Sequence, residues 1–125
     1  MEPDFLTWED VLSLHTRSLA EHGGSEGIRD RGLIESAVAQ PRQDYFFGDA
    51  DRFAIAAAYA FHIAQAQAFL DGNKRTAIAA ALTFLNLNGV TTRGHGEEIY
   101  AAMIAIAERR LDKPGLAALF RELFA

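Results

Sequence analysis

A short polar segment, Asp71 to Arg75, interrupts a long apolar part of the sequence. It holds a carboxylate, a glycine, an amide and two adjacent cations. A helix that begins at Asn73 would present unpaired backbone N–H groups and a positive dipole end here, and both features bind phosphate. Gly72 lets the backbone approach a ligand closely, and Asp71 can hold a magnesium ion on the phosphates. The segment therefore predicts a phosphate-binding site.

The same residues also have a simpler interpretation. Asp-Gly-Asn is a common turn sequence, and Asp71 can cap the helix that follows. Lys74 and Arg75 can be a pair of solvated cations. The segment is not a P-loop, since the GxxxxGK(S/T) spacing is missing and no strand precedes it. Its position favours a site, because a turn between two buried helices gathers polar groups at an opening lined by the core.

Apolar residues at helical spacing, together with start and stop residues, predict the elements around this segment. The expected helices run from an N-cap at Thr7 to Gly23-Gly24, from an N-cap at Asp30 to Pro41, from Phe53 to about Gln67, from Asn73 to Asn88, from Glu97 to Arg110, and from an N-cap at Asp112 through Leu123. In the helix that Glu97 opens, the expected core face is Tyr100, Met103, Ile104 and Ala107.

The two helices that flank the polar segment are apolar all round, which predicts that they are buried. We therefore expect an all-α fold, a single compact bundle of about six helices with a central buried helical hairpin. The chain has 125 residues, half of them hydrophobic, which predicts one domain, residues 1–125.

The segment from Arg42 to Asp49 is aromatic and contains a glycine, so its expected structure is irregular. It can be a connecting loop whose aromatic side chains pack onto the core, or a flap over a neighbouring site. The sequence leaves both open. Two histidines, His15 and His62, fall on apolar helix faces, and we expect them to be packing residues.

Composition narrows the class of protein. The net charge of -5 argues against direct binding of nucleic acid, which usually needs a basic surface. The absence of cysteine excludes disulfides and thiolate metal sites and fits a cytoplasmic setting. The N-terminus does not resemble a signal peptide, and the apolar run from Phe53 to Ala64 is too short to cross a membrane.

The run from Phe69 to Ala77, Phe-Leu-Asp-Gly-Asn-Lys-Arg-Thr-Ala, resembles the signature of the death-on-curing (Doc) toxins, a branch of the Fic fold. The resemblance extends over nearly the whole chain. Other stretches that are similar to this family are His22-Gly23-Gly24, Gly27 to Asp30, Gly32 to Ala37, Ala58 to His62 and Phe84 to Gly89. Lys74 stands where typical Fic proteins have glycine, and Ile78 stands where they have a second arginine. Both differences match the Doc branch.

The resemblance implies the toxin of a bacterial type II toxin–antitoxin system that binds ATP with Mg²⁺ at the start of the helix after the motif. Doc-type members transfer the terminal phosphate to a threonine of translation elongation factor Tu, whereas typical Fic members transfer the nucleotide monophosphate. Carried over by position, Phe69 anchors the loop and Asp71 handles the metal. The residues implied to receive the phosphates are Gly72, Asn73, Lys74 and Arg75, and the implied catalytic set is Gln67, Asp71, Lys74 and Arg75. The stretch Arg42 to Asp49 falls where we expect the flap that positions the target.

One departure from the family pattern concerns catalysis. The family has a histidine two residues before the phenylalanine, and this chain has Gln67. That histidine takes the proton of the target hydroxyl, and glutamine cannot act as a general base. His62 lies five positions earlier, about 140° round the helix, so it does not replace it. Gln67 is either a change made to allow production of a toxic protein or a natural one. We favour the first, because the rest of the motif is intact.

The resemblance also implies a partner. Doc toxins are neutralised by a cognate antitoxin whose C-terminal segment folds as a helix into a groove beside the site. The chain lacks the (S/T)xxxE(G/N) inhibitory helix of some Fic proteins, so inhibition should come from a separate chain. Three functions follow as hypotheses: a Doc-type kinase impaired at Gln67, a nucleotidyl transferase, and a module that only binds nucleotide or antitoxin.

Overall fold

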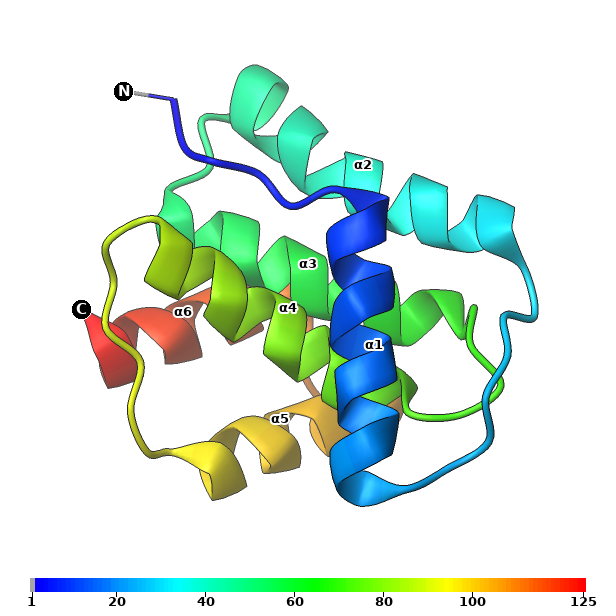
Figure 1. Ribbon diagram of the computed structural model, residues 1–125. Coiled ribbons are helices and arrows are strands. Elements are labelled where there is room, and N and C mark those ends of the chain that lie inside the picture. The colour runs from blue at the N-terminus through cyan, green and yellow to red at the C-terminus, as the bar shows by residue number, and fades with distance from the viewer. Residues whose placement is uncertain (1) are drawn as a thin grey trace.

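The computed structural model describes residues 2–125, which form six α-helices in a compact arrangement (Figure 1). The helices are α1 (Trp8–His22), α2 (Arg31–Gly48), α3 (Arg52–Ala66), α4 (Asn73–Leu87), α5 (Gly96–Ala107) and α6 (Lys113–Phe124). No sheet forms within these residues, and their one β-type pairing is an isolated bridge between Ile28 and Phe69. The predicted all-α fold is therefore confirmed.

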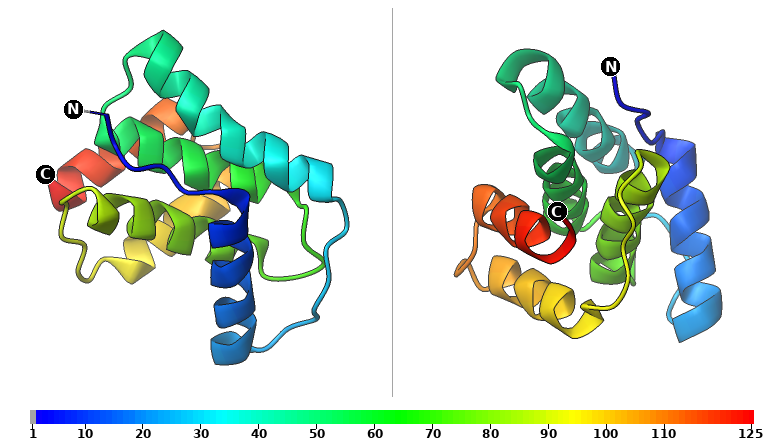
Figure 2. Two further views of the ribbon diagram at one scale, coloured as in Figure 1. Left: turned by 45° about the horizontal axis from the view of Figure 1, so that its top comes forward. Right: turned by 90° about the vertical axis from the view of Figure 1, so that its left-hand side faces the viewer.

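Helix α3 is the centre of the molecule. It packs against α2, α4, α5 and α6, and Figure 2 shows these helices arranged around it. Its small alanines permit close approach, and eight of its residues are buried, the six from Ile55 to Ala60 together with Ile63 and Ala64. Helix α4 pairs with α3 and is covered by α1 and α5, but its last turn is open, with Leu87 53% exposed. The predicted central hairpin is present, with α3 the more enclosed member.

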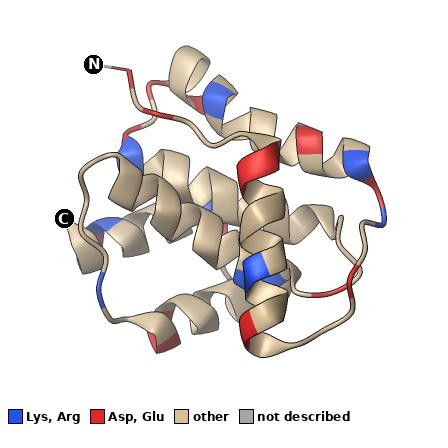
Figure 3. Cartoon of the chain, viewed as in Figure 1, with Lys and Arg blue, Asp and Glu red and all other residues tan. Residues whose placement is uncertain are grey.

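Charged residues are rare in the two central helices. Arg52 is the one charged residue of α3, and α4 has only Lys74 and Arg75, all in first turns (Figure 3). No helix in the described part of the chain is long and apolar enough to cross a membrane.

Helix starts agree well with the sequence. Thr7 caps α1 in a capping box with Asp10, and Asp30 and Asp112 cap α2 and α6, all as predicted. Asp51 caps α3 in the same way by accepting from the N–H of Ala54.

The end of α2 was predicted wrongly. Pro41 was expected to stop the helix, but α2 continues to Gly48, and Pro41 is buried within it. Proline costs a helix one hydrogen bond. Here packing offsets that cost, because the ring of Tyr45, one turn further on, lies against Phe5 with centroids 5.7 Å apart.

This continuation also overturns the loop and flap interpretations of Arg42 to Asp49. The segment is the last part of α2, and it leads into the start of α3. Since α3 has 15 residues, the polar segment after its other end lies roughly 20 Å away. Phe47, 90% exposed, is therefore not part of a flap over that segment.

The core face of α5 was predicted wrongly, because it is rotated by about one position. Tyr100, Ile104 and Ala107 are exposed, and the buried residues are Ile99, Ala102, Met103 and Ile106, so that only Met103 agrees with the prediction. Both sets have helical spacing, because Ile99-Tyr100 and Met103-Ile104 are adjacent apolar pairs. Spacing alone therefore does not select the face that packs.

Tyr59 ties the N-terminal segment to α3. Its hydroxyl accepts a hydrogen bond of 2.8 Å from the backbone N–H of Leu6, and burial raises its pKa to about 12. We expect Tyr59→Phe to lower the free energy of unfolding by about 1–3 kcal/mol, because it leaves the buried N–H of Leu6 without a partner. Urea unfolding measures this. Tyr45→Phe is the matched control and should cost less, and equal losses would contradict the role given to the Tyr59 hydroxyl.

Candidate active site

The loop between α3 and α4 borders a cavity of about 390 Å³. Its lining consists of Gln67, Leu70, Asp71, Gly72, Asn73, Lys74, Arg75 and Tyr100. The structure thus brings all the predicted site residues except Phe69 to one cavity. Phe69 is 1% exposed and lies in the core, in agreement with its expected role as the anchor of the loop. Tyr100, which reaches the cavity from α5, was not predicted as a site residue.

The first turn of α4 has no side-chain cap. Its N-cap residue is Gly72, in the left-handed region with φ 77°, so the interpretation of Asp71 as the cap is wrong. The first backbone N–H that the helix itself uses is that of Thr76, which bonds the carbonyl of Gly72 at 3.0 Å. The N–H groups of residues 73–75 precede it and are those that a helix leaves unpaired. This end of α4 is therefore open to an anion.

Lys74 and Arg75 add charge to this opening. Lys74 is half-buried and Arg75 is exposed, and neither forms an ion pair within residues 2–125. A half-buried cation without a counter-ion is unfavourable, and a bound anion relieves that cost. The pair is therefore suited to the phosphates of a ligand.

Asn73 has a task that the sequence did not predict. Its side-chain oxygen accepts from the N–H of Phe69 at 3.1 Å, and its amide nitrogen donates to the carbonyl of Phe69 at 3.0 Å. The amide was expected to contact phosphate, but here it closes the loop between Phe69 and the start of α4. One N–H of the amide nitrogen stays free for a ligand.

Asp71 is held by backbone groups from two directions. One carboxylate oxygen accepts from the N–H of Gly72 at 2.8 Å, and the other from the N–H of Ser25 at 3.2 Å. Gly24 permits this approach, because a Cβ there would lie 2.9 Å from the Asp71 carboxylate. Each oxygen keeps a lone pair, so the carboxylate can still bind a cation.

The structure fits a magnesium ion that is held partly by its substrate. No cluster of three or more acidic or histidine side chains that could hold a metal occurs in the part of the chain that is described. Magnesium commonly uses one or two carboxylates together with substrate phosphates and water. Asp71, beside the open end of α4, has one such carboxylate.

A second segment, Gly27 to Asp30, lies along the loop, where the two chain segments cross at the edge of the molecule (Figure 1). The N–H of Leu70 bonds the carbonyl of Gly27 at 3.1 Å, and the N–H of Arg29 bonds the carbonyl of Ala68 at 2.6 Å. The Arg29 guanidinium also donates to the carbonyl of Gln67. Sequence reasoning missed these contacts, because the partners are about 40 positions apart and no local pattern marks them.

Gln67 is the C-cap of α3, in the left-handed region with φ 51°. Its side-chain amide donates to the carbonyl of Ala64 at 3.0 Å, so the side chain turns back onto the end of its own helix. Neither nearby histidine replaces it as a base. His62 contacts Lys113 of α6, and the buried His15 has its Nε2 on the carbonyl of Asp71.

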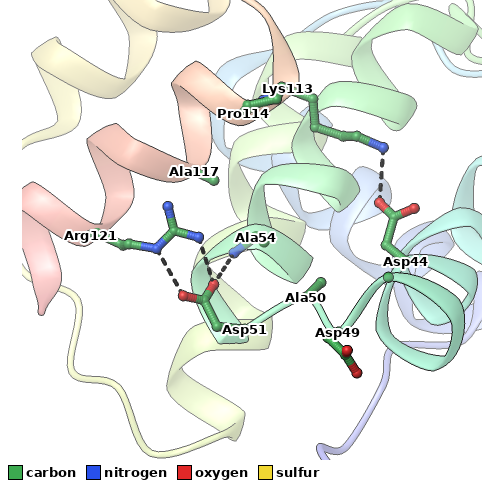
Figure 4. A pocket seen from close by; sticks show the side chains of 10 residues that line it. Asp44, Asp49, Ala50, Asp51, Ala54, Lys113, Pro114, Ala117 and Arg121 are labelled. Carbon is green, nitrogen blue, oxygen red and sulfur yellow. Dashed lines mark hydrogen bonds and ion pairs between the residues drawn. The ribbon is translucent and has the colours of Figure 1, made fainter.

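A different cavity, of about 500 Å³, lies between the end of α2, the start of α3 and α6. Lys113 pairs with Asp44 at 2.9 Å and Arg121 pairs with Asp51 at 2.8 Å, and Figure 4 shows both pairs. Both cations of this cavity are paired with carboxylates, in contrast to Lys74 and Arg75, and the carboxylate of Asp49 also lines it. The cavity therefore offers less to an anionic ligand than the one at α4.

His62 extends this charged cluster. Lys113 Nζ lies 3.1 Å from its Nε2, and since an ammonium only donates, that nitrogen accepts and is unprotonated. Burial, and then the Lys113 charge, hold the pKa of His62 below its usual 6.5. The unfolded chain therefore binds this proton at a higher pH than the folded protein does. The contribution of neutral His62 to the free energy of unfolding is therefore complete above pH 6.5. It should be lost as the pH falls from 6.5 toward the lower pKa that His62 has in the folded protein.

Urea unfolding between neutral and acidic pH tests this expectation. His62→Gln should flatten the pH dependence, while His22→Gln at the exposed end of α1 should leave it unchanged. An unaltered slope in His62→Gln would show that other groups cause the acid destabilisation.

Comparison with known proteins adds independent information. A sequence model of the Fic/DOC family matches residues 5–85. "Toxin Doc" of Mycolicibacterium smegmatis is 44% identical over 89 residues, which cover 70% of this chain and 66% of that protein. "Protein kinase doc" of Escherichia phage P1 is 34% identical over 83 residues, which cover 66% of each. The matched region thus spans just under two thirds of the length of each of these relatives.

Proposed function

This chain belongs to the Fic/DOC family, and we propose that it is the toxin of a bacterial type II toxin–antitoxin system. The proposed activity is transfer of the terminal phosphate of ATP to a threonine hydroxyl of elongation factor Tu, which arrests translation in the cytoplasm. The observation that carries it is the open end of α4, where two unpaired cations and a carboxylate surround free backbone N–H groups. The phage P1 relative, named a protein kinase, supports phosphate transfer as the type of reaction.

Each group has a part in that reaction. The threonine oxygen forms a bond to the terminal phosphorus, the bond from that phosphorus to the bridging oxygen breaks, and ADP leaves. The N–H groups of residues 73–75, with Lys74 and Arg75, would hold the phosphate oxygens and stabilise the charge that develops on them. Asp71 would hold Mg²⁺, which offsets phosphate charge when it is bound.

The position that takes the proton of the threonine hydroxyl in the family holds a residue that cannot accept it, and Asp71 is assigned to the metal. Gln67 does not titrate, and its amide is bonded to the end of α3. The site as it stands is therefore equipped to bind the donor and poorly equipped to activate the acceptor. We propose that the chain with Gln67 is a strongly impaired enzyme.

Two other functions remain testable. The orientation of Gln67 favours a module that binds nucleotide or antitoxin without turnover. Nucleotidyl transfer has less support, because Ile78, at the place of the second arginine of typical Fic proteins, is half-buried among core residues and adds no charge.

Labelled ATP separates the three. The Gln67→His chain is incubated with elongation factor Tu and Mg·ATP labelled on either the terminal or the alpha phosphate. We expect terminal label on the factor, lost in the same chain with Lys74→Ala. Alpha label would show nucleotidyl transfer. Tight ATP binding without transfer of either label to the factor would support the binding module.

The antitoxin is the partner that we expect for this chain, by analogy with the relative named Toxin Doc. A groove of about 630 Å³ between α1 and residues 24–28 adjoins the loop, and we assign it to the helix of the antitoxin. Its apolar lining includes Leu12, Leu19 and Ile28, which suit the apolar face of an amphipathic helix.

A further inference from the structure

His15 reaches the active-site loop from α1, more than 50 positions earlier in the chain. It is 6% exposed, and its ring makes a stacking contact and a polar contact with the loop. The ring stacks on Phe69 with centroids 3.7 Å apart and planes 12° apart. Its Nε2 lies 2.8 Å from the carbonyl oxygen of Asp71. His15 thus holds the loop at two residues that flank the turn into α4.

The direction of the hydrogen bond is fixed by its partner. A carbonyl oxygen only accepts, so Nε2 of His15 carries the hydrogen and donates. The peptide group is planar, and in a trans peptide its C=O and N–H point in opposite directions. The bond therefore sets the orientation of the whole peptide unit between Asp71 and Gly72. The carbonyl points toward α1, and the N–H of Gly72 points to the other side.

This orientation matters for an anion. His15 lines the groove beside α1 and not the cavity at the end of α4, so the Asp71 carbonyl is directed away from that cavity. If the peptide rotated, its oxygen would turn toward the ligand, and its partial negative charge would repel phosphate. Gly72 makes such a rotation easy, because glycine has access to a wide range of backbone conformations. The N–H of this peptide bonds the carboxylate of Asp71 itself, a contact within the same two residues, and His15 adds a restraint from another element.

We infer that His15 is a positioning residue of the phosphate site, which keeps the Asp71–Gly72 peptide turned for anion binding through its Nε2–H donor. The inference rests on the proposed function, since it presumes that a phosphate ligand binds at α4. The inference assigns this role to the Nε2–H donor of His15 and not only to the packing of its ring. Two variants distinguish the donor from the packing. His15→Phe keeps an aromatic ring beside Phe69 but removes the donor. His15→Gln removes the ring but offers an amide N–H at a similar reach.

The experiment is calorimetric titration of the full chain with Mg·ATP, accompanied by thermal unfolding of each variant. We expect His15→Phe to weaken binding by about 5- to 10-fold, as the loss of one such hydrogen bond implies. We expect His15→Gln to stay within about 3-fold of the parent protein, although it loses the stacking contact. Ser18→Ala, also buried on α1 and with no side-chain hydrogen bond to the loop among residues 2–125, is the control and should not change the affinity.

The outcomes separate this inference from the proposed function. If the parent protein does not bind Mg·ATP, the proposed function fails and the inference with it. If the parent binds and His15→Phe binds equally well, or if His15→Gln is as weak as His15→Phe, the inference alone is overturned. If His15→Phe is unfolded at the assay temperature, His15→Gln is compared with His15→Met, which has a similar size and no donor.

Discussion

Replacement of Gln67 by histidine is expected to raise the rate of phosphate transfer by about 100- to 10,000-fold, which is the usual contribution of a general base. The other groups of the proposed reaction line the cavity, whereas Gln67 cannot act as the general base for the acceptor hydroxyl. The measurement is a single-turnover rate of phosphate transfer to elongation factor Tu at saturating Mg·ATP, so that binding of the donor does not contribute. We expect the affinity for Mg·ATP to change little.

The backbone at this position accepts a histidine. Gln67 has φ 51° and ψ 38°, a left-handed conformation in which histidine is more common than most residues. The Arg29 guanidinium holds the carbonyl of residue 67, and that contact does not depend on the side chain. The substitution forfeits the bond from the Gln67 amide to Ala64, which caps the end of α3 at a partly exposed site. The cost in stability should therefore be at most about 1 kcal/mol.

Gln67→Ala is the control, since it removes the amide without providing a base. Its rate should stay close to that of the parent chain. With histidine at position 67 the rate should also rise with pH through about 6.5, the usual pKa of histidine, and the parent chain should lack this rise. A Gln67→His rate no faster than that of Gln67→Ala would mean that histidine at this position is not the base, and would favour the binding module.

The sequence predicted much of the fold because its signals are local. Thr7, Asp30 and Asp112 start helices through side-chain bonds that span three residues, and the apolar character of α3 is present in every turn. The failures occurred where packing decides. Pro41 stays inside α2 because Tyr45 beyond it has a place on Phe5. Tyr100 leaves the core of α5 because its neighbour Ile99 fills that place.

The same contrast between local signals and long-range packing applies to the candidate site. The residues from Gln67 to Arg75 are contiguous, so a motif finds them, and the structure places them around one cavity. The groups that hold this loop come from elsewhere: His15 on α1, and Ser25 and Arg29 on the segment before α2. Each lies about 40 or more positions from its partner, and no periodicity links residues at that distance. The sequence predicted residues that line one cavity, while the groups that shape the loop required the fold.

The chain has two lysines, and they provide a second test with a built-in control. Lys74 is half-buried at the open end of α4 without an acidic partner, whereas Lys113 is half-buried in the other cavity and pairs with Asp44 at 2.9 Å. Lys74→Met should weaken binding of Mg·ATP by about 10- to 100-fold, because one charge-assisted hydrogen bond to phosphate is lost. Lys113→Met should leave the affinity unchanged.

The effects on stability should be reversed. Lys74→Met removes a cation that has no ion-pair partner within residues 2–125, so the free energy of unfolding should stay the same or rise. Lys113→Met leaves Asp44 without its counter-ion and removes the donor to His62, and since the pair is partly exposed the loss should be about 1 kcal/mol. Calorimetry gives the affinity of each variant for Mg·ATP, and urea unfolding gives the free energy of unfolding of each. If Lys74→Met loses stability while it keeps its affinity, Lys74 serves the fold, and the anion site at α4 must be abandoned. If both variants lose affinity, binding follows the net charge of the protein, and the α4 cavity has no special role.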